Sequence, residues 1–231
     1  MNYNISILKK ATLRLQPLHR KHGKVAFISK LPQKAKLFDV GCGNASSNKI
    51  KYIRPDLYYI GIDICEYNPA NNIKEIADEI IITSPEKFHI EIENRKNHFD
   101  AILSAHNLEH CNEPTKVMNA MIESLKKGGV LYLSFPSDVS VNFPSDKIIG
   151  LNFFDDPTHN QVINFRDTIN YLKSNEMQII YSAHQYKSFL FYVLGLIVEP
   201  FRRLFNIHIS TAATWAYWGF ESIIIAKKLS K

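Results

Sequence analysis

The sequence has little cysteine. Its three cysteines, Cys42, Cys65 and Cys111, lie far apart and form no C-x-x-C pair. This spacing argues against a disulfide framework and a cysteine zinc site, and it is typical of a protein kept in a reducing cytosol. The sequence also lacks an apolar run after its first methionine, so no secretory signal is expected. We therefore expect a cytoplasmic protein.

Long apolar stretches are missing as well. The longest, Phe189 to Val198, has ten residues, about half of the ~20 that a membrane span needs. Any membrane contact is therefore expected to be peripheral. No internal repeat and no low-complexity tract interrupts the chain. With ordinary apolar and charged fractions, its 231 residues predict one folded domain with a sizeable core.

Acidic residues are absent before Asp39, whereas basic residues are frequent there. Nine lysines and arginines precede Asp39, in a chain with a net charge of +6. A solvated basic helix is one interpretation. The alternatives are contact with an anionic membrane surface or substrate, RNA binding, and a mitochondrial presequence, the last opposed by the few serines.

Expected strands and helices alternate through the first half of the chain. The strands are expected at 37–40, 57–62, 79–82, 99–103 and 130–135, and the helices at 3–22, 46–53, 85–95 and 114–125. The two glycines of the KKGG stretch, residues 126–129, are expected to end the last of these helices. The alternation predicts a parallel sheet with helices on both faces, which is a three-layer α/β/α architecture.

The second part of the chain has a different pattern. Residues 136–165 are expected to be rich in loops and 187–217 to be aromatic and irregular, with a helix over 169–174 and strands over 178–182 and 220–228. We expect a basic helical segment over 1–34 and one α/β domain over 35–231. Two insertions in that domain, at about 140–165 and 187–217, are expected to serve the substrate.

The turn after the first strand combines glycines with a carboxylate. Asp39 stands two residues before Gly41, and Gly43 follows. A dinucleotide site would need a third glycine where Ser46 stands. A carboxylate here would also repel a pyrophosphate, at a cost on the order of 1–4 kcal/mol. The same carboxylate favours a cationic ligand that the bare glycine backbone lets approach closely.

A second acid supports a nucleoside-like ligand. Asp63 ends the stretch YYIGID, 24 residues after Asp39 and near the offset of about 20 residues expected for a ribose-binding acid. Its carboxylate can accept hydrogen bonds from both ribose hydroxyls. A helix N-cap is the alternative role for Asp63.

Four stretches occur in order between residues 35 and 138: FDVGCGNAS, YIGIDI, FDAILSAHNLEHCNEPTKVM and SLKKGGVLYLSFPS. Together they resemble the successive motifs of class I S-adenosylmethionine-dependent methyltransferases, of the small-molecule type 11 and quinone-biosynthesis-like group. The resemblance implies a Rossmann-like doubly wound sheet of seven mostly parallel strands with an antiparallel last strand, supplied by 220–228. It also implies S-adenosylmethionine as the cofactor.

The resemblance also assigns residues to the cofactor. It implies that the methionine part is surrounded by Asp39, Gly41, Cys42 and Gly43, the ribose by Asp63, the adenine by Ile64 and Ser84, and the amino group and methyl by Ala105 and His106. Two positions depart from the pattern. Ser84 stands where the family usually has an aspartate, and Ala45 replaces the third glycine of the first motif.

A poorly acidic acceptor hydroxyl would also need a base, and histidine suits that task. His106 and His110 stand four residues apart in SAHNLEHC, a spacing that puts them on one helix face with Glu109 pointing elsewhere. The order is not H-E-x-x-H, so no metal is expected. The resemblance implies that Glu109 and His110 shape the loop beside the cofactor. His106 is a catalytic candidate.

The stretch NFFDDPTHNQ, residues 152–161, holds the other polar cluster. Here Asp155 or Asp156 could orient His159 as a base for the acceptor, and we take His159 and Asp156 as catalytic candidates. A plain turn is the alternative, because Asp-Asp-Pro-Thr is favourable turn chemistry. A similar run occurs in methyltransferases encoded among polysaccharide-synthesis genes, and this resemblance points to a sugar acceptor.

Residues 189–205 are apolar and end near Arg202 and Arg203. A core or lid helix, a dimer surface, and a segment that meets a membrane or a lipid-linked substrate are the three interpretations. The protein could therefore be a monomer or a homodimer.

The leading functional hypothesis is methyl transfer to a small molecule, most simply a hydroxyl of a sugar or of a polysaccharide or glycolipid precursor. A quinone or another lipid-like ring is the alternative acceptor. Methylation of RNA is a weaker hypothesis, because the sequence has neither an N/D-P-P-Y motif nor a Pro-Cys pair. No specific nucleic acid is therefore expected as a partner. A binding protein with a relict cofactor pocket is opposed by the intact Asp39, Gly41, Gly43 and Asp63.

Overall fold

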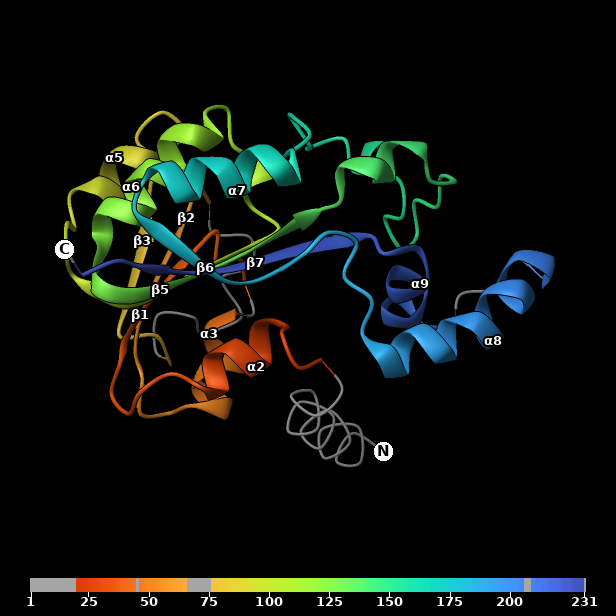
Figure 1. Ribbon diagram of the computed structural model, residues 1–231, viewed down its shortest axis with the longest axis horizontal. Coiled ribbons are helices and arrows are strands. Elements are labelled where there is room, and N and C mark those ends of the chain that lie inside the picture. Colours follow the sequence, from red (N-terminus) through yellow and green to blue (C-terminus); the bar gives the residue numbers. More distant parts are fainter. Residues whose placement is uncertain (1–19, 45, 66–75, 206–208, 231) are drawn as a thin grey trace.

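A computed structural model of the chain describes residues 20–44, 46–65, 76–205 and 209–230, and its centre is a seven-stranded sheet (Figure 1). The strands are β1 (Lys36–Val40), β2 (Tyr58–Asp63), β3 (Glu79–Ile82), β4 (Phe99–Ala105), β5 (Leu125–Pro136), β6 (Met177–Ala183) and β7 (Glu221–Lys228). Ala45 and nearly all of the helix expected over 3–22 lie outside the described residues.

The sheet has the order β3-β2-β1-β4-β5-β7-β6. The pairs β1–β2, β1–β4, β2–β3 and β4–β5 are parallel, whereas β7 runs antiparallel to both β5 and β6. The order starts at β1 and winds outward in both directions. The predicted doubly wound, mostly parallel sheet with an antiparallel last strand is therefore confirmed.

Helices cover both faces of this sheet (Figure 1). On one face lie α5 (Phe88–Glu93), α6 (Pro114–Ser124) and α7 (Phe165–Ser174), and on the other lie α2 (Lys24–Ser29) and α3 (Ser46–Ile53). Two further helices, α8 (Phe189–Phe205) and α9 (Thr211–Trp218), lie beyond one end of the sheet. Three short 3-10 turns complete the described elements: η2 (Leu108–His110), η3 (Asp138–Asn142) and η4 (Phe153–Asp155).

The central strand β1 is buried from both sides, because its alternate side chains enter two separate cores. Phe38 and Val40 pack into the cluster that includes the apolar face of α6, whereas Leu37 packs with Phe27 of α2. Phe38 also stacks on Phe99, with ring centroids 4.5 Å apart. A strand held on both faces is a rigid support for the turn that follows it.

The helix before β5 ends earlier than expected. α6 ends at Ser124, because Leu125 already has an extended backbone and begins β5. Gly128 has a positive φ of 77°, so it turns the chain within the irregular start of β5 and does not cap the helix. The helix therefore ends one residue before the expected position 125, and the expectation that the KKGG stretch caps it is wrong.

The expectation of an irregular segment over 187–217 is wrong, because α8 and α9 occupy most of it, and a helix was indeed one of the interpretations of residues 189–205. Local signals explain α9: the Ser210 hydroxyl accepts from the Ala213 N–H at 3.3 Å, and Gly219 ends the helix with a φ of 69°. The two helices pack closely at Gly195, where a Cβ would lie 2.6 Å from the Ala213 carbonyl oxygen.

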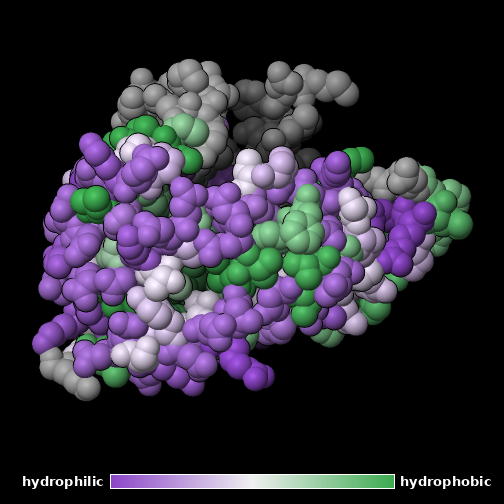
Figure 2. Space-filling view, turned by 90° about the horizontal axis from the view of Figure 1, so that it is seen from above, coloured by the Kyte–Doolittle hydropathy of each residue, from purple (hydrophilic) through white to green (hydrophobic). Residues whose placement is uncertain are grey.

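One face of α8 is apolar and exposed. Phe189 is 81% exposed and Leu204 is 76% exposed, and Leu190, Leu196, Ile197, Phe201 and Phe205 are exposed as well. Figure 2 shows hydrophobic residues at this end of the molecule. Among the described residues, no helix combines the length and the apolar character needed to cross a bilayer.

Candidate active site

The site lies at the edge of the sheet where the parallel strands end. β1 runs into Gly41, β2 ends at Asp63 and β4 ends at Ala105. The antiparallel β7 begins at this same edge, because its first residue, Glu221, pairs with the last residue of β5. In open α/β sheets, ligands bind at this edge, beside the strand from which the order winds outward.

The turn after β1 has two glycines with different surroundings. Both have positive φ, 76° at Gly41 and 56° at Gly43. A Cβ on Gly41 would lie 2.3 Å from Asn107 Oδ1, whereas a Cβ on Gly43 would have no described atom within 4 Å. Gly41 is therefore required by local packing, and Gly43 presents bare backbone to open space.

Asp63 is joined to this turn. Its Oδ2 accepts from the Gly43 N–H and its Oδ1 accepts from the Ile64 N–H, both at 2.8 Å. Each carboxylate oxygen still has a lone pair, which two neighbouring hydroxyls could use. Ile64 follows at 43% exposure and offers an apolar surface beside that carboxylate. These residues fit a ligand that carries a ribose and an apolar ring.

Asp39 lies deeper than the turn. It is fully buried, and its Oδ2 accepts from Ser46 Oγ and from the Tyr59 hydroxyl, the latter at 2.9 Å. Lys24 Nζ lies 3.7 Å from the same oxygen and offsets part of the negative charge. Oδ1 is buried with no hydrogen-bond partner among the described residues. That oxygen keeps the capacity to accept from a cationic ligand.

The other cofactor candidates are less directly placed. The Thr83 N–H donates to the Asp63 carbonyl oxygen at 3.0 Å, which brings the end of β3 and the exposed Ser84 towards Asp63. Ala105 is the half-buried last residue of β4. Cys42 packs its side chain into the core below the turn, and burial raises the pKa of its thiol. Cys42 can therefore contribute only its backbone to a ligand.

His106 is the middle of a buried row of alternating charges. Its Nδ1 lies 3.3 Å from Glu109 Oε1 and its Nε2 lies 3.4 Å from Glu221 Oε1, and Arg20 pairs with Glu221. Burial alone would lower the pKa of His106, but the two carboxylates outweigh it and raise the pKa to about 10. With both nitrogens facing carboxylates, this ring is placed to orient groups and not to accept a proton.

The basic residues Arg20 and Lys24 thus reach the site from the segment before β1. Sequence reasoning interpreted that segment as a solvated helix, a membrane or substrate contact, an RNA contact or a presequence. For these two residues the structure shows ion pairs with acids at the carboxyl edge, Glu221 and Asp39. Only the three-dimensional structure brings these charges together, since 201 residues separate Arg20 from Glu221.

His159 is buried, with a side chain that is only 8% exposed. Its Nδ1 lies 2.6 Å from the Phe153 carbonyl oxygen. A carbonyl only accepts, so Nδ1 carries the hydrogen and Nε2 keeps its lone pair. The orienting group is therefore a backbone carbonyl, whereas Asp156 Oδ2 lies 3.9 Å from Nε2.

The two aspartates before His159 differ in role. Asp155 accepts from the backbone N–H groups of Asp146, Leu151 and Asn152, so it organises the loop. Asp156 accepts from Thr158 through the backbone N–H at 2.9 Å and through the hydroxyl at 2.6 Å. Asp156 therefore makes turn contacts and also leaves Oδ2 near His159.

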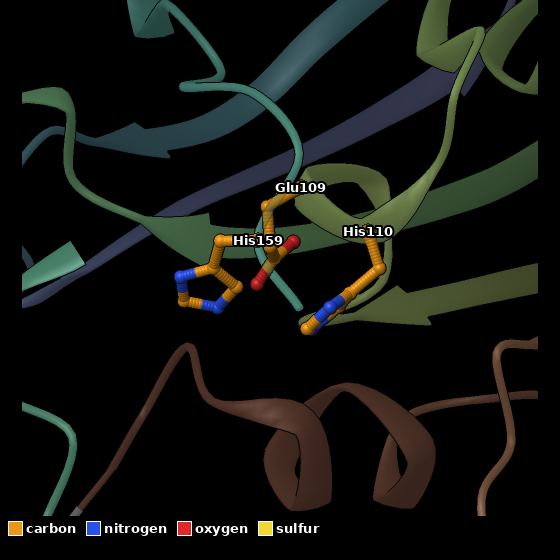
Figure 3. A group of neighbouring side chains, drawn as sticks. All are labelled: Glu109, His110 and His159. Carbon is orange, nitrogen blue, oxygen red and sulfur yellow. The ribbon is translucent and has the colours of Figure 1, made fainter. Parts of the chain in front are cut away.

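Glu109 lies among the histidines, so the expectation that it points elsewhere is wrong (Figure 3). The reason is local: His110 ends the 3-10 turn η2, whereas that expectation assumed an α-helix. Ligand atoms of Glu109, His110 and His159 all lie within 4.8 Å of one another. The structure thus brings His110 to His159, while His106 contacts Glu109.

A further polar group was missed by sequence reasoning. Asp138 Oδ1 lies 2.6 Å and Ser137 Oγ lies 3.1 Å from His184 Nε2, and Phe165 stacks on the same ring at 5.1 Å. Ser137 and Asp138 follow β5 directly, and His184 follows β6. Their positions immediately after strands were the signal that could have identified them.

A small cavity adjoins the row of charges. It has a volume of about 20 Å³ and is lined by Arg20, Tyr186, Ser188, Phe191, Ala212, Trp215, Ala216 and Glu221. The Trp215 ring lies 5.4 Å from that of His106. Room for about one water molecule is too little for an acceptor, so binding there would require α8 or α9 to move.

Comparison with known proteins agrees with this geometry. Residues 13–187, more than half of the chain, match a family profile described as a methyltransferase domain. No curated protein matches the chain.

Solved structures share the fold at low sequence identity. A SAM-dependent methyltransferase from Archaeoglobus fulgidus is 17% identical, with 96% of this chain and 93% of that chain covered and a TM-score of 0.57. A SAM-dependent methyltransferase from Mesorhizobium loti is 14% identical, with 88% of this chain and 96% of that chain covered and a TM-score of 0.62. The [4+2]-cyclase SpnF is 14% identical, with 96% of this chain and 81% of that chain covered and a TM-score of 0.56. At these identities the likeness shows the fold alone, and the fold carries more than one chemistry.

Proposed function

The chain belongs to the methyltransferase domain family, and on this premise we propose that it transfers a methyl group from S-adenosylmethionine to a small-molecule hydroxyl. The acceptor that we favour is a sugar or a polysaccharide or glycolipid precursor. The observation that carries the proposal is Asp63, whose carboxylate is held at the carboxyl edge by the bare Gly43 backbone. The polar cluster of Glu109, His110 and His159 lies beside the segment after β4, and its side chains would contact the acceptor hydroxyl.

The cofactor residues have separate tasks. When bound, S-adenosylmethionine supplies a methyl group on a sulfonium, whose carbon–sulfur bond breaks with its electrons left on sulfur. Asp63 would bind the ribose hydroxyls and Ile64 the adenine. Gly41 and Gly43 would let the backbone approach the methionine part, and the negative Asp39 beneath them favours its cationic groups. Positioning of this kind can supply roughly 7–11 kcal/mol of the barrier.

His159 would contact the acceptor hydroxyl. Its Nε2 is the nitrogen with a free lone pair, because Nδ1 donates to the Phe153 carbonyl oxygen. Asp156 lies beside that nitrogen and is half exposed, so it could bind a second hydroxyl of a sugar. His106 would orient the site through its contacts with Glu109 and Glu221.

Labelled S-adenosylmethionine tests the proposal directly. The purified chain is incubated with sugars, nucleotide sugars, lipid-linked sugars and reduced quinones, and transfer of the labelled methyl group is measured. We expect transfer to a compound of the sugar classes. Binding of S-adenosylmethionine without transfer to any hydroxyl compound of this panel would count against the proposed reaction.

The His159→Ala variant tests the residue assignment. Affinity for S-adenosylmethionine should stay within about twofold, while turnover falls by roughly 10²–10⁴. The matched control is His89→Ala, since His89 lies on α5 and outside the site. Equal losses of cofactor affinity and turnover in His159→Ala would assign His159 to cofactor binding.

A quinone or another lipid-like ring is the second candidate acceptor, and the exposed apolar face of α8 favours it. That face would rest on a membrane surface that holds the acceptor, with the exposed Arg203 near anionic headgroups. Binding to vesicles of phosphatidylglycerol and phosphatidylcholine should fall at least tenfold when Ile197, Phe201 and Leu204 are replaced by serine. Burial of each such side chain is worth up to roughly 1.5–3 kcal/mol.

The control for the vesicle experiment is Ile90→Ser, because Ile90 is exposed on α5, away from α8. If the triple variant binds vesicles as well as the wild type, the apolar face of α8 does not contact the membrane. If the triple variant changes from dimer to monomer, the face is a subunit interface.

RNA is the weakest candidate acceptor. Arg20 and Lys24, the first basic residues that the structure describes near the site, pair with Glu221 and Asp39. They are therefore engaged within the protein. Submicromolar RNA binding that weakens steeply with salt would overturn this ranking.

A further inference from the structure

Two histidines and a buried glutamate converge beside the loop that follows β4 (Figure 3). Glu109 and His110 come from η2, and His159 comes from the loop after η4. One ligand atom of each residue lies within 4.8 Å of the others. We propose that Glu109, His110 and His159 bind a divalent transition-metal ion.

Both imidazoles have a backbone carbonyl oxygen beside Nδ1. His110 Nδ1 lies 3.1 Å from the Thr158 carbonyl oxygen, and His159 Nδ1 lies 2.6 Å from the Phe153 carbonyl oxygen. Each Nδ1 therefore carries the hydrogen and donates it, and each Nε2 keeps a lone pair. Metal-binding histidines usually donate their second nitrogen to a carbonyl or carboxylate in this way, which fixes the tautomer and the ring orientation.

Glu109 provides independent support. The residue is fully buried, and neither carboxylate oxygen has a hydrogen-bond partner among the described residues. Oε1 lies at ion-pair distance from His106 Nδ1, 3.3 Å, and Figure 3 shows the carboxylate between His110 and His159. A buried carboxylate without hydrogen bonds is costly. A cation bound by the other oxygen would offset that cost.

A second carboxylate stands at the edge of this cluster. Asp156 Oδ2 lies 3.9 Å from His159 Nε2, while Asp156 Oδ1 is engaged by Thr158. Asp156 is thus placed to bind the ion or a water molecule on it. Two carboxylates, Glu109 and Asp156, face the cluster, so the local charge favours a cation.

The donor set selects the kind of ion. Two imidazoles and a carboxylate suit zinc, iron(II), cobalt or nickel, whereas calcium and magnesium prefer oxygen ligands alone. Ligand atoms lie about 2.0–2.2 Å from a tetrahedral zinc ion, so two of them are roughly 3.3–3.6 Å apart. The observed limit of 4.8 Å is larger, so the side chains would rotate towards one another when an ion binds.

Three protein ligands would leave positions open on the ion. Resting on the proposed function, we place the acceptor oxygen at an open position, where the ion lowers the pKa of a bound hydroxyl. His159 Nε2 would then help to hold the ion, and the hydroxyl proton would pass to the Asp156 carboxylate as the methyl group bonds to the oxygen. The expectation of no metal considered His106 with His110, and His159 with the aspartates beside it, whereas the structure brings His110 and His159 together with Glu109.

Cobalt(II) is the probe for binding, because its visible absorption reports coordination without any enzymatic activity. The full chain is treated with chelator, dialysed and titrated with cobalt(II), and zinc(II) is then added in competition. We expect one equivalent to bind the wild type. His110→Ala, His159→Ala and Glu109→Gln should each lose at least about tenfold in affinity.

His89→Ala is the matched control and should bind like the wild type. Circular dichroism shows which variants fold. If the buried Glu109→Gln does not, the half-exposed His110→Ala carries the test. Absence of cobalt binding by the wild type, or equal binding by wild type and His110→Ala, would overturn the metal site.

Activity separates this inference from the proposed function. Metal binding together with methyl transfer that is lost on chelation and restored by the ion supports both. Methyl transfer that survives chelation overturns the metal's role and leaves the proposed function in place. A bound metal with no methyl transfer to any acceptor overturns the proposed function alone.

Discussion

Three buried carboxylates at the carboxyl edge of the sheet differ in their partners, and this difference separates their tasks. Asp63 accepts from backbone N–H groups and keeps lone pairs for a ligand. Asp39 accepts from two hydroxyls and supports the glycine turn from below. The carboxylate of Glu109 faces the histidines and has no hydrogen-bond partner among the described residues. On the proposed function, similar side chains would therefore serve the cofactor, the turn and the acceptor end.

Asp63→Ala should weaken binding of S-adenosylmethionine by about ten- to a hundredfold. The reason is the loss of one charged hydrogen-bonding group, worth roughly 1.5–3 kcal/mol. Titration calorimetry measures the change, with Glu93→Ala as a control, because Glu93 lies on α5 and pairs with the surface Lys96. An unchanged affinity in Asp63→Ala would remove this residue from the cofactor site.

Gly41→Ala and Gly43→Ala form a matched pair of variants. Both force a side chain into positive φ, which costs about 1–2 kcal/mol. Gly41→Ala adds a clash with Asn107, worth roughly a further 1–3 kcal/mol, whereas Gly43→Ala meets open space. Denaturant unfolding should therefore show the larger loss of stability in Gly41→Ala.

The same pair separates stability from binding. Gly43→Ala should lose cofactor affinity out of proportion to its loss of stability, because its Cβ would enter the space left for the ligand. Equal cofactor affinity in Gly43→Ala and the wild type would show that the ligand does not approach this backbone.

The helices α8 and α9 are attached to the rest of the chain by a buried ionic group. Glu199 accepts from Arg202 Nε and Nη2, both at 2.8 Å, and from Trp218 Nε1 at 3.0 Å. Arg202 also pairs with Asp146, in the loop before η4. An apolar helix with one anchored face can thus keep its other face exposed.

Glu199→Gln should remove the pH dependence that the Glu199 ion pairs give to the stability of the protein. Burial alone raises the pKa of Glu199, but Arg202, Trp218 and Arg203 outweigh burial and lower it. A carboxyl with a lowered folded pKa stabilises the protein above its ordinary pKa of about 4.3, and the contribution is lost as pH falls through the lowered value. The wild type should be more stable at pH 7 by about 1.5–3 kcal/mol.

Urea unfolding of wild type and Glu199→Gln at several pH values measures this difference. The difference in unfolding free energy between wild type and Glu199→Gln should disappear as the solution is acidified below pH ~4. The surface variant Glu93→Gln should differ from the wild type by less than about 1 kcal/mol at pH 7. A gap between wild type and Glu199→Gln that does not change with pH would contradict the ionic anchor.

At the scale of the whole molecule, the sheet joins all the site segments. Strands β1, β2 and β4 are adjacent and parallel, so their ends form one surface. The antiparallel β7 brings Glu221 to that surface from the far end of the chain. A ligand bound there contacts several elements at once, and its binding is therefore coupled to unfolding of the entire domain.

S-adenosylmethionine should raise the melting temperature. At a concentration 100 times its dissociation constant, a ligand that binds only the folded state stabilises it by about 2.7 kcal/mol. For a chain of this size each kcal/mol is worth roughly 2–4 °C, so a rise of about 5–11 °C is expected. Scanning fluorimetry measures it. Stabilisation by NAD instead would contradict the cofactor assignment.

Much of the sheet could be predicted from the sequence because its signals are local. The bounds of α3 and β3 agree with the expectation, since apolar periodicity and turn residues surround them. The segment over 187–217 was expected to be irregular, because its aromatic residues hide the helical period of α8. That helix depends on distant contacts, such as Arg202 with Asp146.

The parallel sheet, the glycine turn and the acid at the end of β2 could be predicted from patterns of neighbouring residues, and the doubly wound order was implied by the resemblance to methyltransferases. Which charges meet depends on how distant segments fold together. Arg20 joins Glu221 across the length of the chain, and His159 reaches His110 only because the loop after η4 folds back onto η2. The 3-10 geometry of η2 then turns Glu109 into the same cluster. Such meetings depend on the path of the chain in space, which short-range patterns do not encode.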